Sequence, residues 1–345
     1  MIDSATFTLD HVYTLRSNTR VDPQILERSI YALGLLEALV RVRAPIVFKG
    51  GSSLMLLLDH PMRLSTDIDV VVPMGTDLTG YLDEASKIFP FETMEEQVRK
   101  GRNGIVKRHF KFFYASPVTK NQFHILLDVV FEENHYARLV KRPIKNDLLI
   151  VNDPEALVTM PTADCLLGDK ICAFAPHTTG IPLGKDNDLE VIKQMYDVST
   201  LMEVMDSYAD VKTTFDATAA TEIAYRGIRA VPEDVLLDSI DSAACVAGRG
   251  RYGNEYRLYL GGMRSMANHV FGERFNAERA VRHATKVMYL GACLLHSEVP
   301  ELVKNPNPFL QESIATSRFA KLSVLRKQDP LAFAYLVKTI RILGE

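Results

Sequence analysis

The chain has 345 residues, of which 47% are hydrophobic and 24% are charged, and its formal net charge is −3. This composition excludes a globally disordered chain, and the charge balance excludes a uniformly basic nucleic-acid-binding surface while allowing a local basic face. The length predicts about two domains. The four cysteines, at positions 165, 172, 245 and 293, form no CxxC pair, which argues against a zinc site and favours reduced thiols.

The ends of the sequence and its apolar runs bear on location. The N-terminal residues MIDSATFTLDHVYTL include acids and lack an apolar core, so we do not expect them to form a signal peptide. The longest apolar runs, such as residues 54–58, are far shorter than the roughly 20 residues that cross a bilayer. We therefore expect a cytoplasmic protein with no membrane partner.

The first half of the chain alternates between helical and extended patterns. Apolar residues at helical spacing predict helices over 23–43, over 53–59 with Ser52 as its cap, and over 78–88. Strand-like runs lie at 46–48, 67–72, 93–99, 105–115 and 123–132, with a weaker run at 137–151. From Pro161 onward the patterns are mostly helical. The predicted fold is therefore α+β, with a mixed β-sheet core in residues 1–155 and a mostly helical domain in residues 156–345.

The segment 48–72, FKGGSSLMLLLDHPMRLSTDIDVVV, contains the motif with the clearest chemical meaning. Gly50 and Gly51 follow a strand and let the backbone approach a ligand closely, and hydroxyl and N–H groups at the following helix start suit a phosphate. Asp67 and Asp69 are two residues apart on a predicted strand, so both side chains are expected on one face. Two adjacent carboxylates repel each other unless a cation lies between them, and oxygen ligands of this kind suit Mg²⁺ with phosphate oxygens.

Asp128 is the candidate third carboxylate. It lies in mid-strand between Leu127 and Val129, where an isolated ionised group is costly to bury. Three carboxylates with Mg²⁺ can activate an attacking hydroxyl and stabilise a leaving pyrophosphate. The alternative for Asp128 is a partly exposed strand acid paired with a neighbouring lysine. A glycine-serine turn, an acid pair and a distant third acid together predict nucleotidyl transfer.

These motifs resemble those of the AbiEii/AbiGii-type toxins of the polymerase-beta-like nucleotidyltransferase superfamily. The matching segments are Phe48-Lys49-Gly50-Gly51-Ser52-Ser53-Leu54, Arg63-Leu64-Ser65-Thr66-Asp67-Ile68-Asp69, Asp169-Lys170-Ile171-Cys172-Ala173 and Lys193-Gln194-Met195-Tyr196-Asp197-Val198. The resemblance covers about residues 45–205. In the last segment, Gln194 stands where the family pattern leads us to expect an aspartate.

The resemblance implies a nucleotidyltransferase-like sheet core and Mg²⁺-dependent transfer of NMP from NTP to an RNA acceptor, the 3′ end of tRNA, together with a cognate antitoxin partner. It assigns the metal to Asp67 and Asp69, the role of metal ligand or of base for the acceptor hydroxyl to Asp128, a phosphate to Lys170, and the orientation of Lys170 or the nucleotide to Asp197. The alternative for Lys170 and Asp197 is a surface ion pair between helices. The residues it implies for nucleotide binding are Lys49, Gly50, Gly51, Ser52, Ser53, Arg63 and Ser65. The helical domain is expected to contribute to the active-site cleft.

Two basic runs bear on the acceptor. No acid occurs over residues 97–127, which contain Arg99, Lys100, Arg102, Lys107, Arg108, Lys111 and Lys120 among Phe110, Phe112, Phe113 and Tyr114. Such a hairpin could follow an RNA backbone and stack on its bases, or its aromatic side chains could simply fill the core. A second run contains Arg249, Arg251, Arg257 and Arg264 with Tyr252, Tyr256 and Tyr259. It could extend an RNA-binding face or decorate a helical bundle.

Two other functions stay open from the sequence. One is nucleotidylation of a protein or small-molecule hydroxyl, and the other is a catalytically inactive nucleotidyltransferase fold that binds RNA or a partner protein. The nine histidines form no HxxxH or HExxH arrangement, so we expect surface or core histidines rather than metal ligands.

Overall fold

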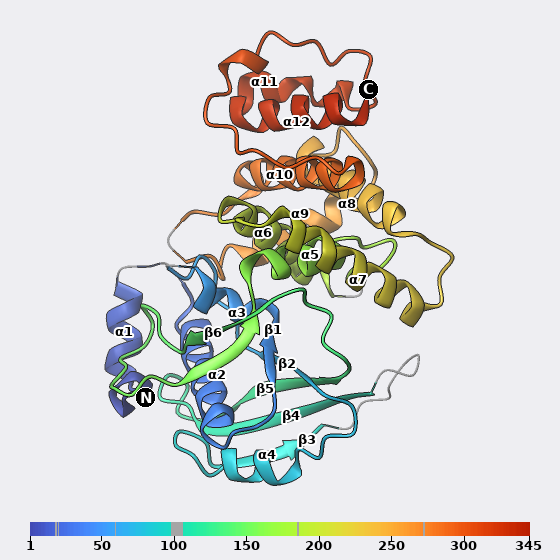
Figure 1. Cartoon of the computed structure of the whole chain (residues 1–345). Helices are drawn as coiled ribbons and strands as arrows, with labels where there is room; N and C mark the ends of the chain where they lie inside the picture. The colour runs from blue at the N-terminus through green and yellow to red at the C-terminus, as the bar shows by residue number, and fades with distance from the viewer. Residues whose placement is uncertain (18, 20, 59, 98–105, 185, 272) are drawn as a thin grey trace. The chain divides into compact units, whose positions relative to one another are not determined.

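The chain folds into two compact units (Figure 1). The computed structural model describes all residues except 18, 20, 59, 98–105, 185 and 272. Unit 1 comprises Met1–Thr162 and Asn268–Glu273, and unit 2 comprises Ala163–Ala267 and Arg274–Glu345. The chain therefore passes from unit 1 to unit 2 a few residues beyond the boundary drawn from the sequence, and one later segment belongs to unit 1.

Unit 1 is built on a five-stranded sheet with the strand order β1-β2-β5-β4-β3. Its strands are β1 (Val47–Lys49), β2 (Ile68–Val72), β3 (Thr93–Glu96), β4 (Val106–Ala115) and β5 (Gln122–Phe131). β2 and β5 are parallel, whereas the other neighbouring pairs are antiparallel. β6 (Leu139–Pro143) and β7 (Leu157–Pro161) form a separate antiparallel pair. This mixed sheet confirms the predicted α+β core.

The helices of unit 1 include one that covers a face of the sheet. They are α1 (Leu9–Ser17), α2 (Pro23–Arg41), α3 (Gly50–Leu57) and α4 (Thr79–Ala85), preceded by a 3₁₀ turn at Ser4–Phe7. α2 packs on the sheet through Tyr31, whose ring stacks on that of Tyr114 at 3.9 Å. The buried carboxylate of Glu27 accepts a hydrogen bond from the Tyr114 hydroxyl at 2.9 Å. Because these contacts are buried, this face of the sheet forms the core of unit 1.

Strand alternation leaves the second face of the sheet partly exposed. In β5, Ile125, Leu127 and Val129 are buried, whereas the residues between them are half-buried. We call this second face the open face; it carries Lys49, Asp69, Asp128, Leu126, His124, Lys107, His109, Lys111 and Phe113. Polar and ionisable groups dominate it, so it is the face of unit 1 available for chemistry.

Unit 2 is almost entirely helical, which confirms the predicted helical C-terminal part. Its helices are α5 (Ala163–Ala173), α6 (Asp188–Glu203), α7 (Tyr208–Arg226), α8 (Pro232–Gly248), α9 (Tyr256–Met266), α10 (Ala277–His296), α11 (Leu325–Gln328) and α12 (Pro330–Leu343), with 3₁₀ turns at Asn307–Phe309 and Ala320–Val324. α10 packs against α6, α8 and α12 and forms the centre of this core. Its first turn is capped by Asn276, whose side chain accepts from two backbone N–H groups. The four cysteines are buried free thiols. Across the described residues, every helix is too short or too polar to cross a bilayer.

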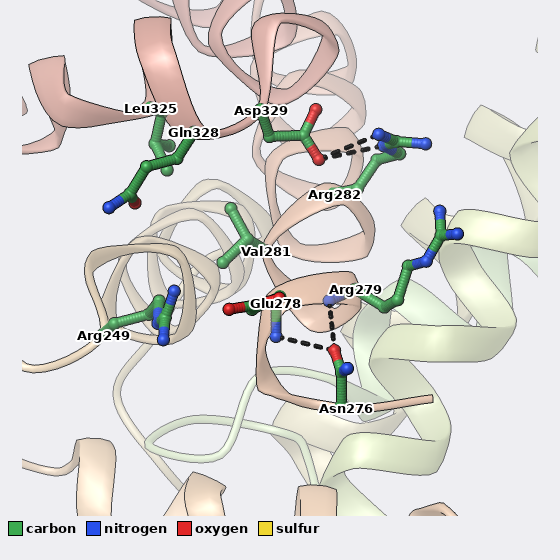
Figure 2. Close-up of a pocket in the computed structure, with 9 residues that line it drawn as sticks. All are labelled: Arg249, Asn276, Glu278, Arg279, Val281, Arg282, Leu325, Gln328 and Asp329. Carbon is green, nitrogen blue, oxygen red and sulfur yellow. Dashed lines mark hydrogen bonds and ion pairs between the residues drawn. The ribbon is translucent and has the colours of Figure 1, made fainter. Parts of the chain in front are cut away.

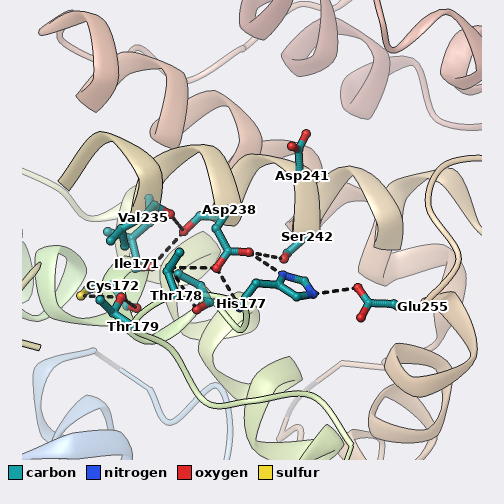
Figure 3. A network of polar contacts seen from close by, with 12 residues as sticks. Ile171, Cys172, His177, Thr178, Thr179, Val235, Asp238, Asp241, Ser242 and Glu255 are labelled. Atoms are coloured by element: carbon teal, nitrogen blue, oxygen red, sulfur yellow. Dashed lines mark hydrogen bonds and ion pairs between the residues drawn. The ribbon is translucent and has the colours of Figure 1, made fainter. Parts of the chain in front are cut away.

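A histidine joins three segments of unit 2 (Figure 3). His177 Nδ1 lies 2.7 Å from Oδ1 of Asp238 in α8, and Nε2 lies 2.8 Å from Oε2 of Glu255, next to α9. The His177 backbone N–H also donates to Asp238 Oδ2 at 2.8 Å. Partial burial lowers the pKa of His177, but hydrogen bonds and charges from Asp238 and Glu255 outweigh it, so the pKa is raised.

Candidate functional site

Four side chains line up across four neighbouring strands on the open face. Asp69 in β2 is the register partner of Lys49 in β1 and of Asp128 in β5. Asp128 is in turn the partner of His109 in β4. Register partners project from the same side of a sheet, and neighbouring strands are about 4.8 Å apart. The sheet therefore brings together two of the three predicted acids, the predicted Lys49, and a histidine that the sequence did not single out.

His109 is directly bonded to the third predicted acid. Its Nδ1 lies 2.6 Å from Oδ1 of Asp128. The sequence predicted an ordinary surface or core histidine here, and offered a neighbouring lysine as the alternative partner of Asp128. The structure differs on the second point, because the β4–β5 register places His109 rather than a lysine directly opposite Asp128. Both strands were predicted, but their register was not, and only the register pairs these residues.

Gly50 packs its backbone directly against the Asp69 carboxylate. Its φ is +78°, and a Cβ atom added there would lie 2.0 Å from Asp69 Oδ2 and 2.8 Å from Asp69 Cβ. A side chain cannot occupy that space, and the positive φ itself favours glycine. Gly50, which was predicted to let the backbone approach a ligand, therefore also packs closely against Asp69, a candidate catalytic residue.

The helix after the glycine pair begins earlier than the sequence predicted. α3 starts at Gly50 with Lys49 in the cap position, so the prediction that Ser52 caps a helix from Ser53 is wrong. Ser53 donates to the Gly50 carbonyl at 2.7 Å, and Ser52 donates to the Asp67 carbonyl. Both serines are fully buried. Their hydroxyls therefore hold the turn together, and their predicted contact with a triphosphate stays a prediction.

Asp67 lies just before β2 rather than within it. The strand begins at Ile68, so the strand alternation that was expected to align Asp67 with Asp69 applies to Asp69 alone. Asp67 Oδ1 lies 3.4 Å from Nη2 of Arg28 in α2. The sequence did not predict this contact, because Arg28 lies far away in the chain and has no motif around it. The guanidinium provides a positive charge beside the first predicted metal ligand.

Arg63 and Ser65 lie beside the second glycine of the motif. Arg63 is buried, and a Cβ atom on Gly51 would lie 2.6 Å from Arg63 Nη2 and 3.0 Å from Ser65 Oγ. The segment Asn268–Glu273 pairs with this part of the chain: the Leu64 N–H donates to the His269 carbonyl at 2.7 Å. The fold thus assembles the predicted glycine, arginine and serine, with help from a distant segment.

The donor set of the open face fits magnesium bound together with a nucleotide. Within the part of the chain that the structure describes, no three His, Cys, Asp or Glu side chains form a ready metal-binding group. Mg²⁺ does not require one, because it takes one or two carboxylates and completes its shell with water and phosphate oxygens. Adjacent Asp69 and Asp128 supply such carboxylates, and their mutual repulsion favours a cation between them.

The two predicted residues of unit 2 form a buried ion pair. Lys170 Nζ in α5 lies 3.1 Å from Asp197 Oδ2 in α6, and their side chains are 6% and 0% exposed. The alternative that these residues form a surface ion pair is therefore wrong. Lys170 also donates to Oε1 of Gln194 at 2.9 Å. Gln194, which stands where an aspartate was expected, thus remains a hydrogen-bond acceptor for the lysine.

Strand alternation divides the basic and aromatic residues of β4 between the two faces. Phe110, Phe112 and Tyr114 are buried in the core, whereas Phe113 lies on the open face with Lys107 and Lys111. The expectation that the aromatic residues fill the core thus holds for three of the four. Arg108 pairs with Glu96 at 2.8 Å. Arg99, Lys100 and Arg102 lie outside the described residues.

Comparison with known proteins gives one family. A family model described as "Nucleotidyl transferase AbiEii toxin, Type IV TA system" matches residues 34–277, well over half of the chain. No curated protein matches the chain. Two similar solved structures are JHP933 from Helicobacter pylori (13% identity, TM-score 0.45, covering 79% of this chain and 93% of that one) and a candidate nucleotidyltransferase from H. pylori (12% identity, TM-score 0.46, covering 79% and 96%). The family match confirms the resemblance found in the motifs and extends it beyond residue 205.

Proposed function

The chain belongs to the AbiEii family of nucleotidyltransferase toxins of type IV toxin–antitoxin systems, and on that premise we propose that it transfers NMP from NTP to an RNA acceptor, the 3′ end of tRNA, in the cytoplasm. A nucleotide substrate and a cognate antitoxin follow from the family. The observation that supports the proposal most directly is the adjacency of Asp69 and Asp128 on the open face, with the Gly50 backbone against Asp69.

The metal in this proposal is Mg²⁺. Asp67, Asp69 and Asp128 would hold it, and when bound it would neutralise the triphosphate and the developing charge on the leaving pyrophosphate. Asp128 has a second role in the proposal. The hydrogen bond between His109 Nδ1 and Asp128 Oδ1 would fix the Asp128 carboxylate and leave its Oδ2 to accept the proton of the acceptor hydroxyl.

The remaining residues would bind and orient the nucleotide. Gly50 and Gly51 let a triphosphate reach backbone N–H groups, while Ser52 and Ser53 hold that turn in place. Lys49, Arg63 and Ser65 would add positive charge and hydrogen bonds beside the phosphates. The assignment of Lys170 to a phosphate, with Asp197 orienting its ammonium, is part of the same proposal. Most of the rate enhancement would come from positioning and charge stabilisation.

The test is a transfer assay with a labelled nucleotide. The purified full chain is incubated with Mg²⁺, total tRNA and each of the four α-labelled NTPs in turn. Asp69→Asn removes a charge from the open face with little change of shape, and Asp83→Asn does the same at an exposed site on α4. We expect label on tRNA with wild type and Asp83→Asn, and a loss of roughly 100-fold or more with Asp69→Asn, equivalent to several kcal/mol of charge stabilisation.

Other outcomes separate the alternatives. Label on a protein band or a small molecule, but not on RNA, would move the proposal to a protein or small-molecule hydroxyl as the acceptor. Binding of NTP or RNA without any transfer, across all four nucleotides, would favour an inactive binding fold. Full activity of Asp69→Asn would remove Asp69 from the catalytic set.

A further inference from the structure

Unit 2 contains a cavity of about 470 Å³ beside the first turns of α10. This volume lies within the range of small-ligand sites. Three arginines line it, one from the end of α8 and two from α10: Arg249, Arg279 and Arg282 (Figure 2). The catalytic role proposed for the open face involves none of these residues, so the cavity has no function assigned to it.

The charges around the cavity leave two arginines available for a ligand. Arg282 is already paired, because its Nη2 lies 3.0 Å from Asp329 Oδ2 and Asp329 also caps α12. Arg249 and Arg279 differ: over the residues that the structure describes, neither guanidinium lies within ion-pair distance of a carboxylate. One uncompensated acid, the exposed Glu278, also lines the cavity. The remaining charge is therefore positive, and Glu278 weakens it.

The polar groups between the arginines are also suited to an anion. Asn276 caps α10 by accepting the N–H groups of Glu278 and Arg279 through Oδ1 at 3.0 and 2.9 Å. Oδ1 is thereby turned to the helix, which leaves the amide NH₂ as a donor. Figure 2 shows Arg249 on one flank of α10 and Arg279 on the other. Positive groups on both flanks suit a ligand with successive negative groups rather than a single small ion.

We propose that this cavity binds phosphates of the RNA backbone, so that unit 2 provides an RNA contact in addition to the sheet residues of unit 1 that carry the transfer chemistry. The inference rests on the proposed function, because it takes the acceptor to be RNA. Arginine recognises phosphate through paired N–H donors, and backbone contacts supply affinity and position without reading sequence. Unit 2 also carries the exposed Arg251, Arg257 and Arg264 outside the lining of the cavity.

The experiment measures binding of a fluorescein-labelled tRNA transcript to the full chain by anisotropy, over a series of salt concentrations. The test variant is Arg249→Asn with Arg279→Gln; asparagine is chosen because Arg249 has a φ of +48°, a region that asparagine tolerates. The control is Arg41→Gln with Arg229→Gln, which removes the same charge from exposed positions elsewhere. Thermal unfolding of each variant checks that the fold is retained.

We expect the test variant to bind tRNA about 10-fold more weakly than the control variant, and the slope of log K against log salt to fall by about 1 for each arginine. Glu278→Gln should bind more tightly than wild type, a gain that a damaged fold cannot produce. In the transfer assay the test variant should raise KM for tRNA and leave kcat unchanged.

Equal binding by the test and control variants, with wild type binding well, would overturn this inference and leave the proposed function intact. Failure of wild type to bind any RNA would instead overturn the proposed acceptor, and this inference with it. If the test variant loses affinity for inorganic pyrophosphate but not for tRNA, the cavity is a site for free phosphate compounds, and the RNA assignment is wrong.

Discussion

Gly50→Ala is the sharpest test of the site geometry, because the chain provides a matched control. Gly50 has a φ of +78° and Gly75 has a φ of +79°. A methyl group on Gly75 meets nothing within 4 Å, whereas one on Gly50 meets the Asp69 carboxylate. Both substitutions impose the same backbone strain, so any difference between the variants measures the crowding at Asp69.

The expected cost can be worked out from the contacts. Placing alanine at these φ values costs roughly 1–2 kcal/mol, which is all that Gly75→Ala should lose. In Gly50→Ala the new methyl group lies 2.0 Å from Asp69 Oδ2, 2.7 Å from Cγ and 2.8 Å from Cβ. Rotation of the Asp69 side chain relieves the first two contacts but not the third, because Cβ is fixed to the backbone. The strand or the turn must therefore move, which adds about 1–3 kcal/mol.

Urea unfolding and the transfer assay measure the two consequences. We expect Gly50→Ala to be less stable than Gly75→Ala by the crowding cost, and to lose about 100-fold in activity, since a displacement near 1 Å can cost that much. Gly75→Ala should keep wild-type activity. If Gly50→Ala matched Gly75→Ala in both stability and activity, the close packing of Gly50 on Asp69 would have no functional meaning.

Three further predictions concern stability. Asp197→Asn should lower the free energy of unfolding by about 3–5 kcal/mol, because it leaves the Lys170 ammonium buried without its counter-charge. Urea unfolding measures this loss. The control is Asp216→Asn, which breaks the exposed ion pair with Lys212 and should cost under about 1 kcal/mol. The raised pKa of His177 means that its stabilisation is complete below pH of about 6.5 and is lost as the pH rises through the raised value. The difference in Tm between wild type and His177→Gln should therefore shrink with rising pH, and a constant difference would contradict the ion pairs. Chelation of divalent cations should leave the Tm unchanged, because Asp67 and Asp128 already have partners in the protein, Arg28 and His109; a large drop would instead indicate a structural metal.

The sequence alone indicated the candidate acids, but it did not indicate their neighbours in the fold. Asp67 and Asp69 stand out at the start of an apolar strand and Asp128 within one, where acids are unusual, and the local pattern is enough to reveal them. His109 and Arg28 reach these acids through strand register and through packing of α2. Both depend on contacts between segments far apart in the chain, which periodicity does not encode.

The start of α3 and the burial of Lys170 were misjudged for a related reason. A serine before an apolar run predicts a helix cap. Here the Ser52 hydroxyl instead donates a hydrogen bond to the Asp67 carbonyl, and the helix begins at Gly50. A lysine and an aspartate on separate helices predict a surface pair, but Lys170 and Asp197 lie on the facing sides of α5 and α6. In both cases a contact with a residue on another segment, rather than the local sequence preference, determines the observed structure.

Two of the predicted acids of unit 1 have partners in the protein before any ligand binds. Asp67 lies 3.4 Å from Arg28 of α2, and Asp128 is hydrogen-bonded to His109 of β4. Lys49 of β1 is the register partner of Asp69, but its ammonium lies 3.8 Å from Glu132 Oε1. The contacts of Asp67 and Asp128 stabilise these carboxylates in the folded state. A metal ion at this face would therefore compete with side chains already in place, and under the proposed function the triphosphate would supply additional oxygen ligands. We therefore propose that the open face binds metal and nucleotide together rather than metal alone.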